Sequence, residues 1–131
     1  MARVAFVTGG TRGIGHAICA RLQSEGIRVA AGYSGNDEAA RACADELGCM
    51  VVKGNVGNFE DCRRAVEAVE KELGPVDILV NNAGITRDGV FHKMTPEQWG
   101  DVIRVNMDSV FNMTRQVIEG MRDRGWGRII N

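Results

Sequence analysis

Apolar residues occur along the chain in short continuous runs that are separated by stretches of helical periodicity. The runs cover residues 3–8, 27–31, 49–52, 77–80 and 128–130. Continuous apolar runs, unlike alternating ones, are typical of strands that are buried on both faces of a parallel sheet. We therefore predict five parallel strands.

Between these runs, apolar residues recur every three or four positions, as they do on one face of a helix. Three such faces are expected to be buried: Ile14, Ile18 and Leu22; Ala40, Cys43, Ala44 and Leu47; and Phe59, Cys62, Val66, Val69 and Leu73. Asn58 precedes the third face and is a suitable helix cap. Alternation of strands and helices predicts an α/β doubly wound parallel sheet of the Rossmann type, in a single domain over 1–131.

A further helix is predicted from the stretch "TPEQW" (95–99), which combines a Thr cap, Pro at the first helical position and Gln at the third. The helical pattern continues to about Arg124, and Gly125 ends it. The apolar stripe that we expect to be buried contains Trp99, Val102, Ile103 and Val110, and Asn106 falls on the same stripe. A buried amide has to be hydrogen-bonded. The structural interpretation of Asn106 is that it satisfies a broken helix carbonyl.

Composition narrows the functional classes. The net charge is −1 over 131 residues, which gives no basic footprint for nucleic acid. The apolar run at the N-terminus is too short to span a membrane and has no signal-peptide cleavage pattern, so we expect a cytoplasmic protein. Cys19, Cys43 and Cys62 lie on helix stripes and are interpreted as core residues. The two histidines have no partner at ligand spacing, and no metal site is expected.

The stretch "TGGTRGIG" (8–15) joins the first predicted strand to the first predicted helix. Gly9 suits a tight turn, Gly13 allows the backbone to approach a pyrophosphate, and Gly15 allows the helix to pack close to the sheet. The free N–H groups of the helix then face the phosphates. We therefore predict a dinucleotide site here.

The second strand indicates which nicotinamide cofactor is bound. NAD sites usually offer a carboxylate about 20 residues beyond the first glycine, but no acidic residue occurs between Glu25 and Asp37. Arg12 lies in the glycine loop, where a guanidinium can bind a 2′-phosphate, and the hydroxyls of Tyr33 and Ser34 can add hydrogen bonds. These features favour NADP over NAD.

The spacing T-G-x-x-x-G-x-G, together with "NNAG" (81–84) after the fourth strand, resembles the short-chain dehydrogenase/reductase family over the whole chain. The resemblance implies that Asn55 and Val56 contact the adenine, although the family more often has Asp at the first of these positions. It also implies that Asn106 holds a water of the proton relay. The expected cofactor-binding residues are Gly9, Thr11, Arg12, Gly13, Ile14, Gly15, Tyr33, Ser34, Asn55, Val56, Asn82, Ala83, Gly84 and Ile85; the last four line the nicotinamide ribose, with Ile14 beneath the ring.

The family resemblance also implies catalytic residues that this sequence does not contain. Reduction of a ketone requires a proton donor and a group that polarises the carbonyl. In the family these are a Ser after the fifth strand and a Tyr-x-x-x-Lys on the next helix. Here the only tyrosine is Tyr33, without a lysine four residues later, and the last serine is Ser109. We expect the 131 residues to bind cofactor without turnover.

Two stretches, 81–99 and 111–131, resemble one branch of the family, the acetoacetyl-CoA reductases, which implies an acyl-CoA substrate. The 3-oxoacyl-acyl-carrier-protein reductases are the alternative, and a non-catalytic nucleotide-binding or interaction module is a second one. The helix over 107–124 has an apolar face that is expected to pack on a second copy and form a homo-oligomer. This face comprises Met107, Val110, Phe111, Thr114, Ile118 and Met121.

Overall fold

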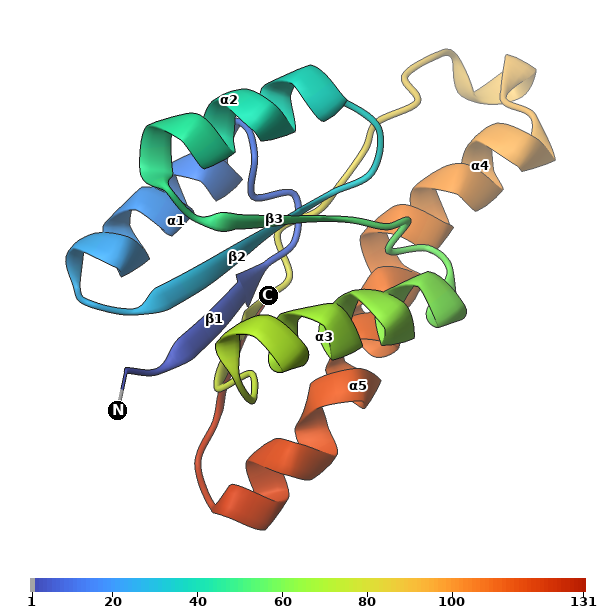
Figure 1. Cartoon of the computed structure of the whole chain (residues 1–131). Coiled ribbons are helices and arrows are strands. Elements are labelled where there is room, and N and C mark those ends of the chain that lie inside the picture. The colour runs from blue at the N-terminus through green and yellow to red at the C-terminus, as the bar shows by residue number, and fades with distance from the viewer. Residues whose placement is uncertain (1) are drawn as a thin grey trace.

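A computed structural model describes residues 2–131 and places five strands in one sheet (Figure 1). The strands are β1 Val4–Val7, β2 Arg28–Tyr33, β3 Met50–Lys53, β4 Ile78–Val80 and β5 Arg128–Ile130. They lie in the order β3-β2-β1-β4-β5, and every neighbouring pair is parallel. All five predicted strands and the doubly wound α/β architecture are confirmed.

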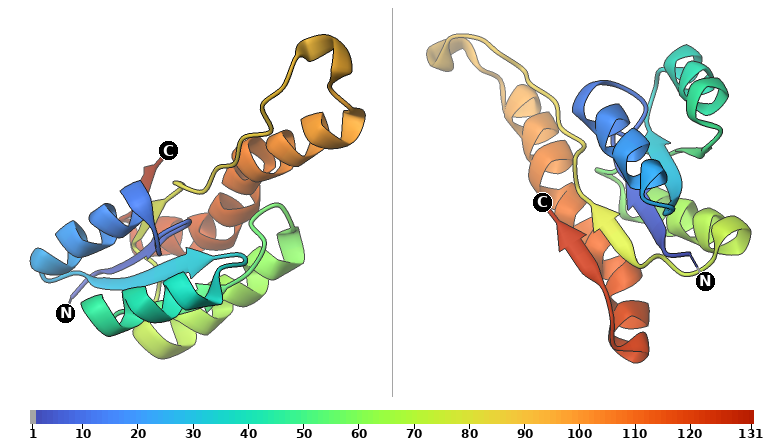
Figure 2. Two further views of the ribbon diagram at one scale, coloured as in Figure 1. Left: turned by 90° about the horizontal axis from the view of Figure 1, so that it is seen from above. Right: turned by 90° about the vertical axis from the view of Figure 1, so that its left-hand side faces the viewer.

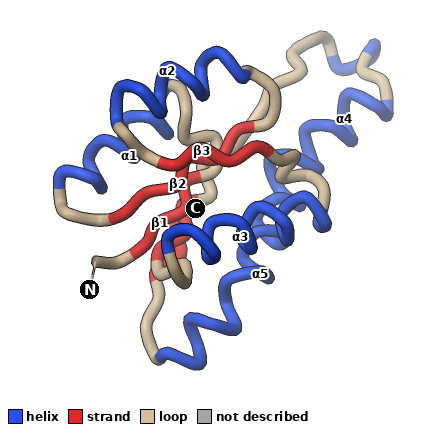
Figure 3. The backbone as a smooth tube through the Cα atoms, in the orientation of Figure 1, coloured by secondary structure: helices blue, strands red, loops and turns tan. Residues whose placement is uncertain are grey.

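Helices cover both faces of the sheet (Figure 2). Helices α1 Gly13–Ser24 and α2 Asp37–Leu47 pack on one face, and α3 Phe59–Leu73 and α5 Ser109–Arg124 pack on the other. Helix α4 Pro96–Ile103 continues into a π-helical turn, η2 Arg104–Asp108, which leads into α5. The connection from β4 to α4 is long and contains only the short turn η1 Phe91–Lys93 (Figure 3).

The sheet separates two apolar cores because side chains alternate along each strand. Phe6 and Leu79 face α3 and α5, whose buried residues are Cys62, Ala65, Val66, Val69, Met113, Val117 and Met121. Val7 and Val80 face α1 and α2, where Cys19 and Cys43 are buried. The prediction that the helix cysteines are core residues is therefore confirmed.

Local sequence signals set the helix ends where they were predicted. The Asn58 side chain accepts a hydrogen bond from the Asp61 N–H at 2.9 Å and so caps α3. Thr95 and Gln98 form a reciprocal capping box at the start of α4, with Pro96 at its first position. Gly125 ends α5 in the left-handed conformation, with φ of +70°.

The predicted buried stripe of the 95–124 helix is wrong. The helix is interrupted by η2, and α4 projects beyond the sheet instead of packing on it (Figure 2). Trp99 is therefore 60% exposed, and Asn106 is exposed as well. The other three residues of that stripe, Val102, Ile103 and Val110, are half-buried.

Two other residues that were expected on buried faces are exposed. Ile14 lies in the first turn of α1, next to a cavity and beyond the sheet. Phe59 lies in the first turn of α3 and stacks on Phe111 of α5, with ring centroids 6.0 Å apart. Among residues 2–131, no helix is long and apolar enough to cross a membrane.

Candidate functional site

A cavity of about 520 Å³ opens at the carboxyl ends of the strands. The strand order reverses between β1 and β4, and ligands of open α/β sheets bind at such a switch point. The volume lies within the range of small-molecule sites, roughly 300–1,000 Å³. Of the fourteen residues that the sequence predicted, thirteen line the cavity: Gly9, Thr11, Arg12, Gly13, Ile14, Tyr33, Ser34, Asn55, Val56, Asn82, Ala83, Gly84 and Ile85.

Gly15, the remaining predicted residue, lies behind the cavity at a close approach between α1 and the loop. A Cβ atom added to Gly15 would lie 2.0 Å from the Gly9 carbonyl oxygen, so only glycine fits there. Gly9 and Gly13 have φ of +61° and +55°, which favours glycine at both positions. A Cβ on Gly13 would meet no protein atom within 4 Å, and the backbone is therefore open to a ligand.

The N-terminus of α1 differs from those of α2, α3 and α4, while α5 continues directly from η2. Arg12 occupies its cap position, and its side chain makes no capping hydrogen bond. In contrast, Asn36, Asn58 and Thr95 cap α2, α3 and α4 with their side chains. The first N–H groups of α1 thus adjoin the cavity without a side-chain cap among the described residues. This arrangement fits a phosphate or pyrophosphate group.

The two sequence motifs form one hydrogen-bonded unit around Thr8. The buried Thr8 hydroxyl accepts hydrogen bonds from the N–H groups of Asn82 and Ala83, both at 2.9 Å. The Asn82 side-chain amide donates to the carbonyls of Thr8 and Gly9, at 3.1 and 3.2 Å. The "NNAG" segment therefore fixes the start of the glycine loop.

Asn106 does not line the cavity but holds one of its edges. Its Oδ1 accepts from the Ile85 N–H at 2.8 Å, and its Nδ2 donates to the Ile85 carbonyl at 2.9 Å. The side chain thus satisfies both peptide groups of a cavity residue on a neighbouring loop, and not a carbonyl of its own helix. The π-helical turn η2 carries Asn106 at this position. Its role in a proton relay stays a prediction.

Three side chains meet at the rim of the cavity beyond β2. The Tyr33 hydroxyl donates to Asp37 Oδ1 at 3.0 Å, and Lys53 Nζ lies 3.1 Å from the same oxygen. The hydrogen bonds from Lys53 and from Tyr33 lower the pKa of the Asp37 carboxyl. Sequence reasoning treated Asp37 only as the end of a segment without acidic residues. The i, i+4 spacing from Tyr33, across the end of a strand, was the available signal.

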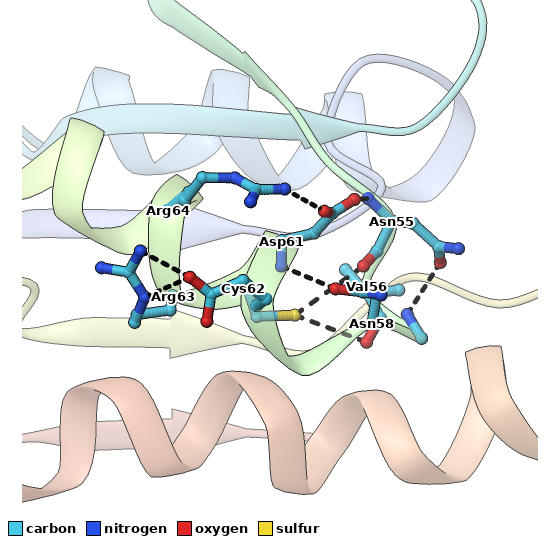
Figure 4. A network of polar contacts seen from close by, with 9 residues as sticks. Asn55, Val56, Asn58, Asp61, Cys62, Arg63 and Arg64 are labelled. Carbon is cyan, nitrogen blue, oxygen red and sulfur yellow. Dashed lines mark hydrogen bonds and ion pairs between the residues drawn. The ribbon is translucent and has the colours of Figure 1, made fainter.

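The first turn of α3 carries a second carboxylate that the sequence analysis missed, and it contacts the loop after β3 (Figure 4). Asp61 Oδ2 accepts from the Asn55 N–H at 2.9 Å, while its other oxygen pairs with Arg64. Asn55 Oδ1 accepts from the Gly57 N–H at 2.8 Å, which leaves one of its lone pairs for a ligand. Asp61 and Asn55 both line the cavity. The position of Asp61 in the first turn of a capped helix was the only signal in the sequence.

Comparison with known proteins places these features in a family. Residues 3–131 match the family model described as short chain dehydrogenase. All 131 residues align with an acetoacetyl-CoA reductase of Rhizobium meliloti at 60% identity and with one of Paracoccus denitrificans at 56%, in each case over 54% of the relative. The chain spans about half the length of these curated relatives.

A solved structure agrees with the sequence relatives. The crystal structure of a variant actinorhodin polyketide ketoreductase with NADPH superposes with a TM-score of 0.93 at 38% identity. The match covers 98% of this chain and 51% of the ketoreductase chain. Family model, relatives and fold agree, and the chain belongs to the short-chain dehydrogenase family.

Proposed function

We propose that this chain is the NADP(H)-binding part of a reductase that converts a 3-oxoacyl thioester, acetoacetyl-CoA, to (R)-3-hydroxybutyryl-CoA. The observation that carries the proposal is the uncapped N-terminus of α1 beside a cavity lined by both family motifs. A helix N-terminus without a side-chain cap provides several N–H donors and a partial positive charge for a pyrophosphate.

Different residues around the cavity are assigned to different parts of the cofactor. In this proposal the free N–H groups at the start of α1 bind the pyrophosphate beside Gly13, and Ile14 lies beneath the nicotinamide ring. Arg12, Tyr33 and Ser34 bind the 2′-phosphate at the end of β2. Asn55 and Val56 contact the adenine. Asn82, Ala83, Gly84 and Ile85 line the nicotinamide ribose.

Bound NADPH supplies the hydride that reduces the carbonyl carbon. The carbonyl oxygen also needs a proton donor, which family resemblance assigns to a Ser and a Tyr-x-x-x-Lys. Neither the Tyr-x-x-x-Lys nor a Ser after β5 occurs among these 131 residues. We therefore propose that the 131 residues alone bind NADP(H) and do not reduce acetoacetyl-CoA. In this proposal, Asn106 holds a water of the proton relay in an enzyme that contains those groups.

The substrate assignment is supported by the relatives, which are acetoacetyl-CoA reductases at 60% and 56% identity. An acyl-carrier-protein thioester has the same reacting 3-oxo group and is the alternative. Comparing acetoacetyl-CoA with acetoacetyl-acyl-carrier protein in a longer chain that carries the catalytic residues distinguishes them. Higher kcat/KM with the carrier-protein thioester would overturn the CoA assignment.

The proposal includes a cytoplasmic homo-oligomer that forms through the α5 side of the molecule. Met107 and Phe111 are 65% and 63% exposed, which is unusual for large apolar side chains and supports this interface. Met121 is only 4% exposed because it packs in the core beneath the sheet, so its predicted place on the interface face is wrong.

Fluorescence titration of the purified protein with NADPH and with NADH tests the cofactor assignment. We expect NADPH to bind at least about tenfold more tightly, because the site offers Arg12 to the 2′-phosphate. Tighter NADH binding, or no NADPH binding, contradicts the assignment. Acetoacetyl-CoA reduction by the 131 residues alone contradicts the proposed lack of turnover. If the chain is instead a non-catalytic module, light scattering should show a monomer in dilute solution.

A further inference from the structure

The carboxylate at the rim of the cavity conflicts with a preference for NADP(H). Asp37 is exposed and bonded to Tyr33, which lines the cavity beside Ser34. An unpaired carboxylate here repels the dianionic 2′-phosphate and offers an acceptor to the ribose 2′-hydroxyl of NAD. A site that selects NADP(H) therefore has to neutralise or hold back this carboxylate.

The sheet register supplies the neutralising cation. Tyr33 and Lys53 are register partners in the parallel β2–β3 pair, so both side chains leave the sheet on the same face. Asp37 is the first residue of α2, which covers that face. Lys53 Nζ lies 3.1 and 3.4 Å from the two oxygens of Asp37. The chain thus closes a Tyr33–Asp37–Lys53 network, which we call the rim network.

The charges of Asp37 and Lys53 cancel each other, so Arg12 leaves a net positive charge at the rim of the cavity. Arg12 makes no ion pair among residues 2–131, and it lines the same cavity. Without Lys53, Asp37 keeps only the weaker attraction of Arg41. Its negative charge then offsets part of the positive charge of Arg12, so the preference for the phosphate falls. With Lys53 in place, Asp37 is neutralised and its oxygens are occupied by Lys53 and Tyr33.

We propose that Lys53 is a specificity-determining residue, which favours NADP(H) over NAD(H) by neutralising Asp37 within the rim network. This inference rests on the proposed NADP(H) site and adds a residue that family motifs do not assign. Lys53 acts through Asp37, and it is a positioning residue and not a direct ligand of the cofactor.

A double-mutant cycle on Lys53→Gln and Asp37→Asn tests the inference through binding alone. The dissociation constants for NADPH and NADH are measured by fluorescence titration, and 2′,5′-ADP and 5′-ADP serve as competing probes of the phosphate. We expect Lys53→Gln to weaken NADPH and 2′,5′-ADP about three- to tenfold and to leave NADH and 5′-ADP within about twofold, as for a partly screened charge pair. The difference between the losses for NADPH and for NADH should shrink as the salt concentration rises.

The Asp37→Asn background decides whether Lys53 acts through the carboxylate. In that background we expect Lys53→Gln to change NADPH affinity by less than about twofold, because Lys53 then has no carboxylate to hold away from the 2′-phosphate. Asp37→Asn alone should change NADPH affinity by less than about twofold, because Lys53 and Tyr33 already hold the carboxylate in the unmodified protein. Lys53→Arg keeps the charge and should retain the preference. Lys71→Gln, an exposed lysine in the last turn of α3, is the matched control and should change neither cofactor.

Equal losses for NADPH and NADH in Lys53→Gln would overturn the inference, as would the same NADPH loss in both backgrounds. If Lys53→Gln does not fold, shown by a lost thermal transition, Lys53→Met replaces it in both backgrounds, and the same two outcomes overturn the inference. None of these outcomes would contradict the proposed NADP(H) site itself. Failure of the unmodified protein to prefer NADPH instead overturns the proposed function itself.

Discussion

At the scale of single residues, the site depends on positions where a side chain cannot fit. Gly15 allows the first turn of α1 to approach the Gly9 carbonyl, which also accepts a hydrogen bond from the Asn82 side chain. A Cβ on Gly15 would also lie 2.6 Å from Asn82 Nδ2. A side chain at Gly15 would therefore push α1 away from both the glycine loop and the "NNAG" segment.

Gly15→Ala is expected to destabilise the protein and to weaken NADPH binding more than tenfold, because α1 has to move away from the loop. The cost of such an overpacked contact is about 1–3 kcal/mol. Thermal unfolding and NADPH titration measure the two effects. Gly89→Ala is the control, since its Cβ would meet no atom within 4 Å. Equal behaviour of the two variants would contradict the role of Gly15.

The roles of the glycines were predictable because they follow from local backbone chemistry. Gly9 and Gly15 were assigned a tight turn and a close approach, and both occur. The bonds of Asp37 and Asp61 were not predictable, because they depend on how α2 and α3 sit relative to the ends of β2 and β3. Sequence spacing does not give that relation.

At the scale of elements, the strands followed directly from the sequence, while the long helix did not. A continuous apolar run leaves few alternatives to a buried strand. The helical periodicity over 95–124 was real, but it gave no sign of the π-helical turn η2. This turn lets Asn106 reach Ile85 and directs α4 away from the sheet. The prediction assumed one uninterrupted helix, and it therefore placed Trp99 wrongly on a buried face.

The core between the sheet and helices α1 and α2 contains three thiols, from α1, α2 and the start of β3. Burial raises the pKa of Cys19 to about 12, with smaller contributions from Cys49 and Cys43. Burial, and then Cys49, likewise raises the pKa of Cys43 to about 11. Both thiols contact the Gly10 carbonyl of the glycine loop.

These thiols should make the protein less stable in alkali. Their folded pKa values lie above the ordinary value of 9.0, so their contribution is present below pH 9 and is lost as the pH rises from 9 toward 12. We expect the free energy of unfolding in urea to fall between pH 8.5 and about 10, and the native thiols to react slowly with a disulfide reagent at pH 8. Fast reaction of all four cysteines in the native protein would contradict this burial.

At the scale of the whole molecule, the chain order of the strands creates the site. β1 is followed by β2 and β3 on one side, and β4 returns to the other side of β1. The chain leaves β1 toward α1 on one face and leaves β4 toward the other face. The two loops are joined at Thr8 and diverge beyond it, where the cavity opens. This arrangement was predictable from the alternation of elements, since parallel crossovers of one hand leave few topologies.

The exposed aromatic residues on α3 and α5 should mediate self-association. Phe111→Glu places a charge on the face that includes Met107 and Phe59, and it should shift the protein toward monomer at micromolar concentration. Phe91→Glu, at another highly exposed phenylalanine, is the control and should leave the distribution unchanged. Light scattering measures both. A shift of equal size in the control would argue against an α5 interface.

Backbone amide NMR during titration with NADPH tests directly whether the cavity is the cofactor site. We predict large shift changes for Gly13, Ile14 and Gly15 at the start of α1 and for Ala83 and Gly84 after β4. The C-terminal end of α5 should stay unchanged. NADH should move the α1 amides but not those of Tyr33 and Ser34 to the same extent. Unchanged amides at the start of α1 in saturating NADPH would contradict the proposed site.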